Sequence, residues 1–238
     1  MNDPAGIPVV IPTLNPGAAL LPLVDGLLRG GAEEVIAVDD GSTSPAARAF
    51  LAEAAAIPGC RLIRHPVNLG KGAALKSAWR ACLETGGRIG IVTADDDGQH
   101  TVADILRIRA ALAARPDALI LGGRDFSLPS VPWRSRFGNR LASLVFRRFA
   151  GISVADTQTG LRGIPCRLAD AMLKLPGNGF ELETEMLLEA PRLAFPVVET
   201  PIETVYIAGN SGTRFHPLRD ALRICGAILR QSGGRRER

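Results

Sequence analysis

Hydrophobic residues in the first half of the chain alternate between short β-like runs and longer stretches with helical spacing. The short apolar runs occupy residues 7–12, 33–40, 60–65, 88–95 and 117–123. Between them, residues 18–30, 44–56, 71–86 and 101–116 carry apolar positions at the period of a helix. Strands separated by helices of this length form parallel βαβ units. The sequence therefore predicts an α/β fold, with a doubly wound, mostly parallel sheet flanked by helices.

The pattern changes after Trp133, where residues 134–149 predict an amphipathic helix. Its apolar face is expected to contain Phe137, Leu141, Leu144, Val145 and Phe149. A basic stripe on another face contains Arg136, Arg140, Ser143 and Arg147. Residues 216–238 predict a second amphipathic helix, with Leu218, Leu222, Cys225 and Leu229 on one side and an arginine-rich end. Such a helix can lie on an anionic membrane or pack against the protein. We expect a main domain over residues 1–215, followed by this helix and basic tail.

Composition is that of a soluble globular protein, with 46% hydrophobic and 22% charged residues. The net charge of +4 and the pI near 9.2 mildly favour anionic partners. The four cysteines are far apart and form no CxxC pair, so buried thiols in a reducing compartment are favoured over disulfides or a zinc site. The N-terminus does not resemble a signal peptide, and no apolar window reaches the ~18 residues of a spanning helix. Any work at a membrane is therefore expected at its surface.

Polar motifs follow three of the predicted strands, at the edge where doubly wound sheets bind ligands. The most acidic is DDDGQH, at residues 95–100. If the strand end stays extended, Asp95, Asp97 and Gln99 point to one side and Asp96 to the other. Two carboxylates and an amide oxygen suit Mg²⁺ or Mn²⁺, with water and phosphate oxygens completing the shell. The alternatives are a solvated acidic turn and a calcium loop, but the calcium loop fits poorly because its glycine and its final glutamate are missing from their usual positions.

Two other motifs leave more than one interpretation open. The aspartates of DDGS, Asp39 and Asp40, can accept hydrogen bonds from a nucleoside base or ribose; equally, the motif can be a turn in which Ser42 or Thr43 caps the next helix. In NLGKGAAL, Lys71 lies between two glycines at a helix start, where it can approach a phosphate. The segment lacks the pattern of a Walker loop, and a plain turn is the alternative.

Taken together, the motifs resemble those of the family 2 glycosyltransferases, and most closely the dolichyl-phosphate mannosyltransferase-like, or polyprenyl-phosphate glycosyltransferase, branch. The resemblance covers most of the chain in consistent order. It runs through IPTLN, VDDGS, NLGKGAAL, DDDGQH, GGRDF, RSRFGNRLAS, DTQTGLRGIP, FELETEMLLEA and VYIAGNSGTRFHPLRDALRI. It implies a GT-A fold and an inverting, metal-dependent transfer of a sugar from a nucleotide diphosphate donor to a polyprenyl phosphate.

Site residues follow from the resemblance by position. The metal site, for Mg²⁺ or Mn²⁺, would contain Asp95, Asp97 and Gln99. The donor site would contain Pro12, Thr13, Asn15, Asp39, Asp40, Lys71 and Asp95. The acceptor phosphate would meet Arg124, Arg136, Arg140 and Arg214. The residues expected to act in catalysis are Asp97, Asp156 and Arg136.

The chain also departs from the family pattern. Pro16 replaces an acidic residue in the first motif and Leu14 replaces an aromatic one, which weakens a donor contact by Asn15. Thr213, Arg214 and Phe215 replace a Ser-His-Phe sequence near the end.

The chemistry of the expected acceptor decides whether the reaction needs a base. A phosphate monoester has a second pKa of ~6, so a polyprenyl phosphate needs positioning more than deprotonation. Transfer to a hydroxyl of a glycan or small molecule is the alternative, and it would require a base. A non-catalytic nucleotide-sugar-binding subunit is a third possibility. We expect the protein at the cytoplasmic face of the membrane, as a peripheral protein with lipid or a membrane subunit as partner, and with no nucleic acid.

Overall fold

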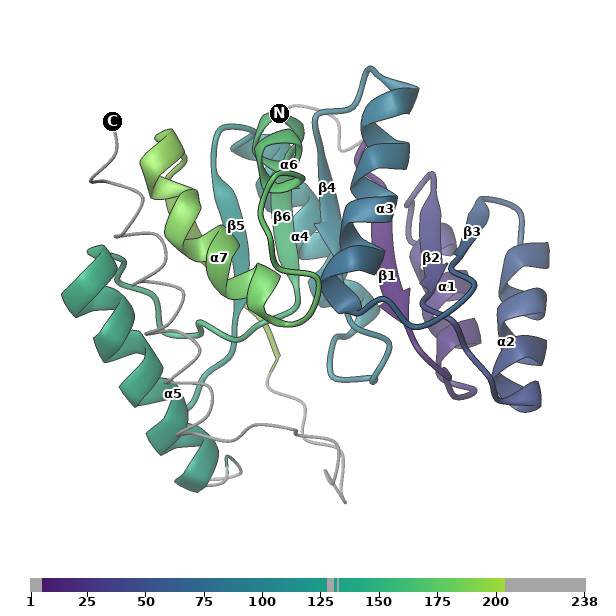
Figure 1. Cartoon of the computed structure of the whole chain (residues 1–238), viewed down its shortest axis with the longest axis horizontal. Helices are drawn as coiled ribbons and strands as arrows, with labels where there is room; N and C mark the ends of the chain where they lie inside the picture. The colour runs from purple at the N-terminus through teal and green to yellow at the C-terminus, as the bar shows by residue number, and fades with distance from the viewer. Residues whose placement is uncertain (1–5, 128–130, 132, 204–238) are drawn as a thin grey trace.

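Seven strands form one sheet, in the order β3-β2-β1-β4-β6-β5-β7 (Figure 1). The structure is a computed structural model that describes residues 6–127, 131 and 133–203. The strands are β1 (Val9–Thr13), β2 (Val35–Asp39), β3 (Cys60–Arg64), β4 (Gly90–Thr93), β5 (Leu119–Gly123), β6 (Arg162–Pro165) and β7 (Val197–Pro201). Neighbouring strands are parallel, except that β6 runs antiparallel to both β4 and β5.

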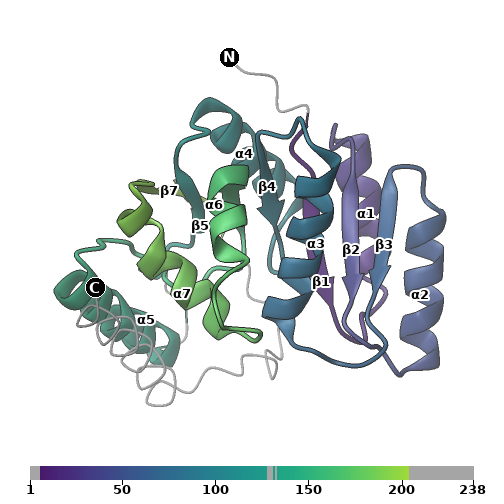
Figure 2. The same ribbon diagram turned by 45° about the horizontal axis from the view of Figure 1, so that its top comes forward.

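Helices cover both faces of this sheet (Figures 1 and 2). They are α1 (Leu20–Arg29), α2 (Pro45–Ala56), α3 (Lys71–Thr85), α4 (Val102–Ala114), α5 (Trp133–Val145), α6 (Cys166–Met172) and α7 (Glu181–Glu189). A π-helical turn, η1 (Phe146–Ala150), extends α5, and a short 3₁₀ helix, η2 (Pro191–Leu193), follows α7. Ser44 and Thr101 cap α2 and α4, because each hydroxyl accepts a backbone N–H of the first helical turn.

Alternation along the strands divides the buried side chains into two cores. Val10 of β1 packs on one face with residues of α3, α6 and α7. Its neighbours Val9 and Ile11 pack on the opposite face with residues of α1, α2 and α4. Because successive strand side chains point to opposite faces, apolar runs such as Val9–Ile11 are buried throughout. The α/β fold and the mostly parallel sheet predicted from the sequence are confirmed.

Strand β6 is the main feature of the sheet that the apolar pattern did not predict. It has four residues, and it begins with Arg162, whose side chain is fully buried. A strand this short, with a charged residue, produces no clear period in the sequence. It nevertheless occupies a central place, with Gly163 opposite both Val92 of β4 and Ile120 of β5. The residues before β6 therefore pass close to the ends of β4 and β5.

Helix α5 packs through a different face from the one predicted. Phe137 and Leu144 of the expected apolar face are 59% and 51% exposed. Among the side chains whose burial the structure describes here, those of Asn139 and Ala142 in α5 and of Phe146 in η1 are buried instead. The side chain of Asn139 bonds to the carbonyl of Ala155, and this contact selects a face that an apolar count does not favour. Both views place α5 at the opposite end of the sheet from α2 (Figures 1 and 2). The amphipathic helix predicted over residues 216–238 lies outside the described residues.

Three of the four cysteines lie in the described part of the chain, and all three are free thiols. Cys82 is buried, and burial raises its pKa to about 12. Cys60 and Cys166 are half-buried. No helix within the described residues is long and apolar enough to cross a membrane.

Candidate active site

The three adjacent carboxylates after β4 point to three different partners. Asp95 Oδ1 lies 2.6 Å from Lys71 Nζ. Asp96 accepts a hydrogen bond from the hydroxyl of Thr13, at the end of β1. Asp97 is exposed, and its Oδ1 accepts the backbone N–H of Gln99 at 3.0 Å. The chain bends at residues 96–98, so the alternation expected of an extended strand stops there. Burial, together with the charges of its two neighbours, raises the pKa of Asp96.

Lys71 forms the centre of a buried ion triad. Its ammonium group lies 2.6 Å from Asp95 and 2.9 Å from Glu183 Oε1 of α7, and its side chain is 14% exposed. Burial opposes the charge on Lys71, but the two carboxylates outweigh it and raise the pKa of this lysine. Burial would likewise raise the pKa of Asp95, yet Lys71 and His100 hold that pKa well below its ordinary value. The triad fixes the start of α3 against both β4 and α7.

Glycines let these segments approach one another. Gly70, before α3, has φ +101°, and a Cβ there would collide with the carbonyl of Asn178. Gly160, before β6, lies against the Asp95 carboxylate, so that any side chain at this position would displace it. The carbonyl of Gly160 also accepts a hydrogen bond from the Thr93 hydroxyl at 2.9 Å. The DTQTG motif is thereby attached directly to the acidic stretch.

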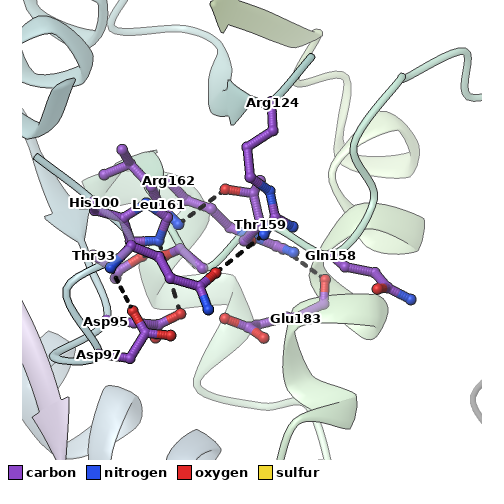
Figure 3. A network of polar contacts seen from close by, with 12 residues as sticks. Thr93, Asp95, Asp97, His100, Arg124, Gln158, Thr159, Leu161, Arg162 and Glu183 are labelled. Atoms are coloured by element: carbon purple, nitrogen blue, oxygen red, sulfur yellow. Dashed lines mark hydrogen bonds and ion pairs between the residues drawn. The ribbon is translucent and has the colours of Figure 1, made fainter. Parts of the chain in front are cut away.

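Arg124 and Asp156 form a second ion pair at this edge. Arg124 follows β5, and its Nε and Nη2 donate to the two oxygens of Asp156 at 2.6 and 3.2 Å. The Asp156 side chain is fully buried, and its Oδ1 also accepts the N–H of Gln158 at 3.1 Å. Arg124 Nη1 donates to Gln99 Oε1 at 3.3 Å. Gln99 thus joins the Asp97 turn to the Arg124–Asp156 pair. In Figure 3, Arg124 lies above the network and Asp97 below it.

The carboxylates of Asp39 and Asp40, at the end of β2, are bonded to other groups of the protein. Asp40 Oδ1 lies 2.7 Å from His65 Nδ1 and accepts the N–H of Leu69, while its Oδ2 accepts the N–H of Gly70. His65 Nε2 lies 2.9 Å from Ser77 Oγ, so this chain of contacts ties the loop before α3 to the helix itself. In the structure Asp40 therefore shapes the loop that carries Lys71.

Asp39 and the first motif form a linked pair of loops. Asp39 accepts the N–H of Ser42 and the Nε of Arg64. Asn15, with φ 52°, accepts the N–H groups of Thr43 and Ser44 through its side chain. The remaining donor-site candidates of β1, Pro12 and Thr13, are buried. The predicted donor residues after β1, β2 and β4 therefore lie on adjacent strands, but several of them are already bonded to one another.

The predicted acceptor arginines are divided between two places. Arg124 belongs to the network described above. Arg136, on α5, donates from Nε to the carbonyl of Val131 at 3.2 Å, and Arg140 of the same helix is exposed. Helix α5 is joined to the Asp156 loop because Asn139 and Ser143 both donate to the carbonyl of Ala155. Arg214 lies outside the described residues.

Two charged residues of the site were not among those predicted. Glu183 lies within FELETEMLLEA and binds Lys71. Arg162 is fully buried, and its Nη1 donates to the carbonyl of Glu183 at 2.6 Å, whereas its Nη2 has no hydrogen-bond partner in the described part of the chain. Burial lowers the pKa of Arg162, and nearby carboxylates oppose that effect. The signal available for both was their place in motifs that carry the family resemblance, FELETEMLLEA and DTQTGLRGIP.

The oxygen donors of the acidic turn fit a hard divalent cation only in part. Within the described residues, no group of three or more His, Cys, Asp or Glu side chains is arranged to hold a metal. Asp95 is neutralised by Lys71, and Gln99 Oε1 is used by Arg124. Asp97 is exposed and has one oxygen bonded to Gln99. A magnesium-type ion commonly uses one or two protein carboxylates and takes its other ligands from substrate phosphates and water. The residues therefore fit such an ion at Asp97, and the part of the chain that the structure describes forms no all-protein cage.

Comparison with known proteins identifies the class to which this fold and site belong. Residues 9–171 match the family described as glycosyl transferase family 2, so the chain belongs to that family and is a glycosyltransferase. The sheet with its flanking helices is the GT-A fold of such enzymes.

Individual relatives show which members the chain is similar to. A UDP-N-acetylglucosamine–dolichyl-phosphate N-acetylglucosaminyltransferase of Methanococcus voltae is 28% identical over 60% of this chain and 59% of its own length. A dolichyl-phosphate beta-glucosyltransferase of Trichomonas vaginalis is 24% identical over 87% of this chain and 69% of that enzyme. Among solved structures, glucosyl-3-phosphoglycerate synthase from Mycobacterium tuberculosis, in complex with Mn²⁺, UDP and glucosyl-3-phosphoglycerate, superimposes with a TM-score of 0.69. It is 20% identical, over 95% of this chain and 80% of that one.

Proposed function

We propose that this glycosyltransferase moves a sugar from a nucleotide diphosphate donor to a polyprenyl phosphate, with inversion at the anomeric carbon. The observation that carries the proposal is the position of Gln99. Its N–H binds Asp97, and its side chain accepts from Arg124, which holds Asp156. Gln99 thereby joins Asp97, the carboxylate that we assign to the donor side, to Arg124, the arginine that binds Asp156. The similarity to two dolichyl-phosphate sugar transferases supports the choice of acceptor.

On the donor side, we assign the acidic turn and the loops after β1 and β2 to the nucleotide sugar. Mg²⁺ or Mn²⁺, bound through Asp97, would supply Lewis-acid stabilisation of the departing nucleotide diphosphate. Lys71 and Asp95 form a paired cation and anion at the start of α3, where a helix N-terminus also favours phosphate. Asp39, Asp40 and the first motif would shape the nucleoside side through the loops that they hold together.

On the acceptor side, the chemistry requires no base. A phosphate monoester is already an anionic oxygen nucleophile near neutral pH, because its second pKa is ~6. Both oxygens of Asp156 accept hydrogen bonds from Arg124, so this carboxylate is better suited to orientation than to proton removal. Arg136 and Arg140 would hold the acceptor phosphate in line with the anomeric carbon, which is a proximity effect.

The exposed face of α5 supports work at a membrane surface. Phe137, Arg140 and Leu144 of α5 are exposed, and so are Arg147 and Arg148 of η1, which extends that helix. Apolar and basic side chains on one helix suit an interface that is anionic at the surface and apolar beneath. We therefore assign the protein to the cytoplasmic face of the membrane as a peripheral enzyme. A membrane subunit that covers the same face is the alternative partner.

A second candidate reaction is transfer to a hydroxyl of a small phosphorylated molecule or a glycan. It is favoured by the solved neighbour, whose complex contains glucosyl-3-phosphoglycerate. Such a hydroxyl would need a general base. The described site supplies Asp156 in a form already bonded to Arg124, which favours the lipid phosphate.

The decisive experiment is a panel of UDP- and GDP-sugars with Mn²⁺ or Mg²⁺ and a short polyprenyl phosphate, scored for lipid-linked sugar. We expect one donor to produce a lipid product that is lost with EDTA and restored with metal. Parallel reactions contain 3-phosphoglycerate or a free sugar as acceptor. Product only in those reactions would replace the lipid acceptor with a hydroxyl. Donor binding without release of nucleotide diphosphate would indicate a non-catalytic subunit.

A further inference from the structure

The peptide unit that precedes the Asp156 side chain is held from two sides by residues outside the proposed binding roles. On one side, Glu199 of β7 accepts backbone N–H groups: Oε1 accepts from Ala155 and from Asp156, each at 2.8 Å, and Oε2 accepts from Ala155 at 2.9 Å. On the other side, the carbonyl of Ala155 accepts from Asn139 and Ser143 of α5. The segment carrying Asp156 is therefore clamped between the sheet and α5.

Glu199 reaches this loop because of its place in the sheet. It lies opposite Leu121 in the parallel pair of β5 and β7, one strand away from the antiparallel β6. The carboxylate lies beside Gly123, at the end of β5: a Cβ there would lie 3.4 Å from Glu199 Oε1, which is ordinary van der Waals contact. The next residue after Gly123 is Arg124, whose guanidinium binds Asp156. The ends of β5 and β7 thus reach the same loop from adjacent positions. Arg124, after β5, binds the side chain of Asp156, and Glu199 of β7 binds the backbone of the loop.

We propose that Glu199 is a positioning residue of the transfer reaction. It sets the backbone of Asp156 so that this carboxylate meets Arg124, and Arg124 in turn meets Gln99. The expected effect on turnover rests on the proposed function. The effect of Glu199 on the loop backbone can be tested without substrate. Hydrogen bonds to a carboxylate are stronger than those to a neutral oxygen, so the loop depends on the charge of Glu199 as well as on its shape. Asn139 performs the matching role from α5, and it connects the proposed acceptor helix to the same peptide.

The first test compares Glu199→Gln with the wild type by amide hydrogen exchange, resolved by NMR in the absence of donor, acceptor and metal. In Glu199→Gln, an NH₂ group replaces one carboxylate oxygen and the negative charge is lost. An NH₂ group cannot accept a backbone N–H, so the Glu199 side of the clamp is weakened. We expect exchange at Ala155 and Asp156 to accelerate by at least about tenfold, which corresponds to the loss of a charged hydrogen bond. Glu203→Gln is the matched control, because Glu203 is exposed near the end of β7 and loses the same charge. Unchanged exchange at both amides would overturn the clamp.

The second test measures steady-state kinetics for the same variants with the donor and acceptor found active in the wild type. We expect Glu199→Gln to lower kcat by about tenfold or more, because a small displacement of a positioned group is costly, while the KM for the donor stays within twofold. In an Asp156→Asn background, Glu199→Gln should have little further effect. An unchanged kcat, or the same fractional loss in both backgrounds, would refute the positioning role. If the wild type transfers no sugar, the proposed function fails, and the exchange result alone then decides whether Glu199 holds the loop.

Discussion

Replacing Lys71 by methionine tests the buried ion triad that joins α3, the acidic turn and α7. Lys71 Nζ lies 2.6 Å from Asp95 and 2.9 Å from Glu183. At an effective dielectric constant of about 20, each contact corresponds to about 6 kcal/mol of Coulomb attraction, and desolvation of the three groups offsets most of it. Methionine preserves most of the side-chain volume but leaves two carboxylates without their cation. Removing one partner of a buried ion pair costs about 3–5 kcal/mol, so we expect a loss of that size in the free energy of unfolding.

The assay is urea denaturation, with thermal unfolding as a second measurement. For a chain of this size, the expected loss lowers Tm by about 6–20 °C. Lys174→Met is the matched control: Lys174 is exposed, and its replacement should change stability by no more than about 0.5 kcal/mol. The double variant Lys71→Met with Glu183→Gln should recover at least about 1 kcal/mol, because one of the two unpaired charges is removed. A double variant less stable than Lys71→Met would refute the charge argument, as would a loss below about 1 kcal/mol in the single variant.

The Lys71–Asp95 ion pair also predicts how the free energy of unfolding depends on pH. Lys71 and His100 hold the pKa of Asp95 below its ordinary value of 3.8, despite burial. A lowered carboxyl pKa contributes stability that is present above 3.8 and is lost as the pH falls through the folded-state pKa. We therefore expect the difference in stability between the wild type and Lys71→Met to narrow as the pH falls below about 4. A difference that stays constant down to pH 2 would contradict this assignment.

The remaining predictions concern the acidic turn and α5. Asp97→Ala should abolish metal-dependent transfer and leave Tm within about 2 °C of the wild type, because Asp97 is exposed; full turnover by this variant would remove the metal assignment. Asp96→Ala should cost about 1 kcal/mol of stability, through the lost hydrogen bond from Thr13, and reduce turnover far less than Asp97→Ala. Equal loss of turnover at both positions would show that Asp96 also acts in the reaction. Arg136→Ala should raise the KM for the acceptor by about tenfold with little change in donor affinity measured by calorimetry; a fall in donor affinity instead would mean that the acceptor site is misplaced.

Much of the fold could be predicted because the first half of the chain repeats one physical pattern. Each of the first five strands is a short run of mostly apolar residues, and each is separated from the next by a stretch long enough for a crossover helix. The edge at which the motifs gather followed from the same pattern, since parallel strands end on one side of the sheet. Local periodicity carries this information because it depends only on neighbouring residues. It failed for β6, which is short and carries Arg162.

The sequence predicted which residues belong to the candidate site better than it predicted which of them contact one another. The acidic turn, Lys71, Arg124 and Asp156 were all among the expected residues. That Lys71 neutralises Asp95, and that Arg124 joins Gln99 to Asp156, could not be derived from spacing. Each of these contacts joins residues well separated along the chain, and their pairing depends on which strands become neighbours.

By itself, the sequence therefore determined the fold class, the positions of the first five strands along the chain and the edge of the sheet that carries polar motifs. Only the tertiary structure decided which charges meet. Inserting β6 between β4 and β5 places the loop of Asp156 against the ends of both strands, and β7 then brings Glu199 to the same loop. The face through which α5 packs was decided in the same way, by the hydrogen bond of Asn139 to that loop. The physical reason is that periodicity reports burial within one element, whereas ion pairs and clamps depend on the packing of several elements.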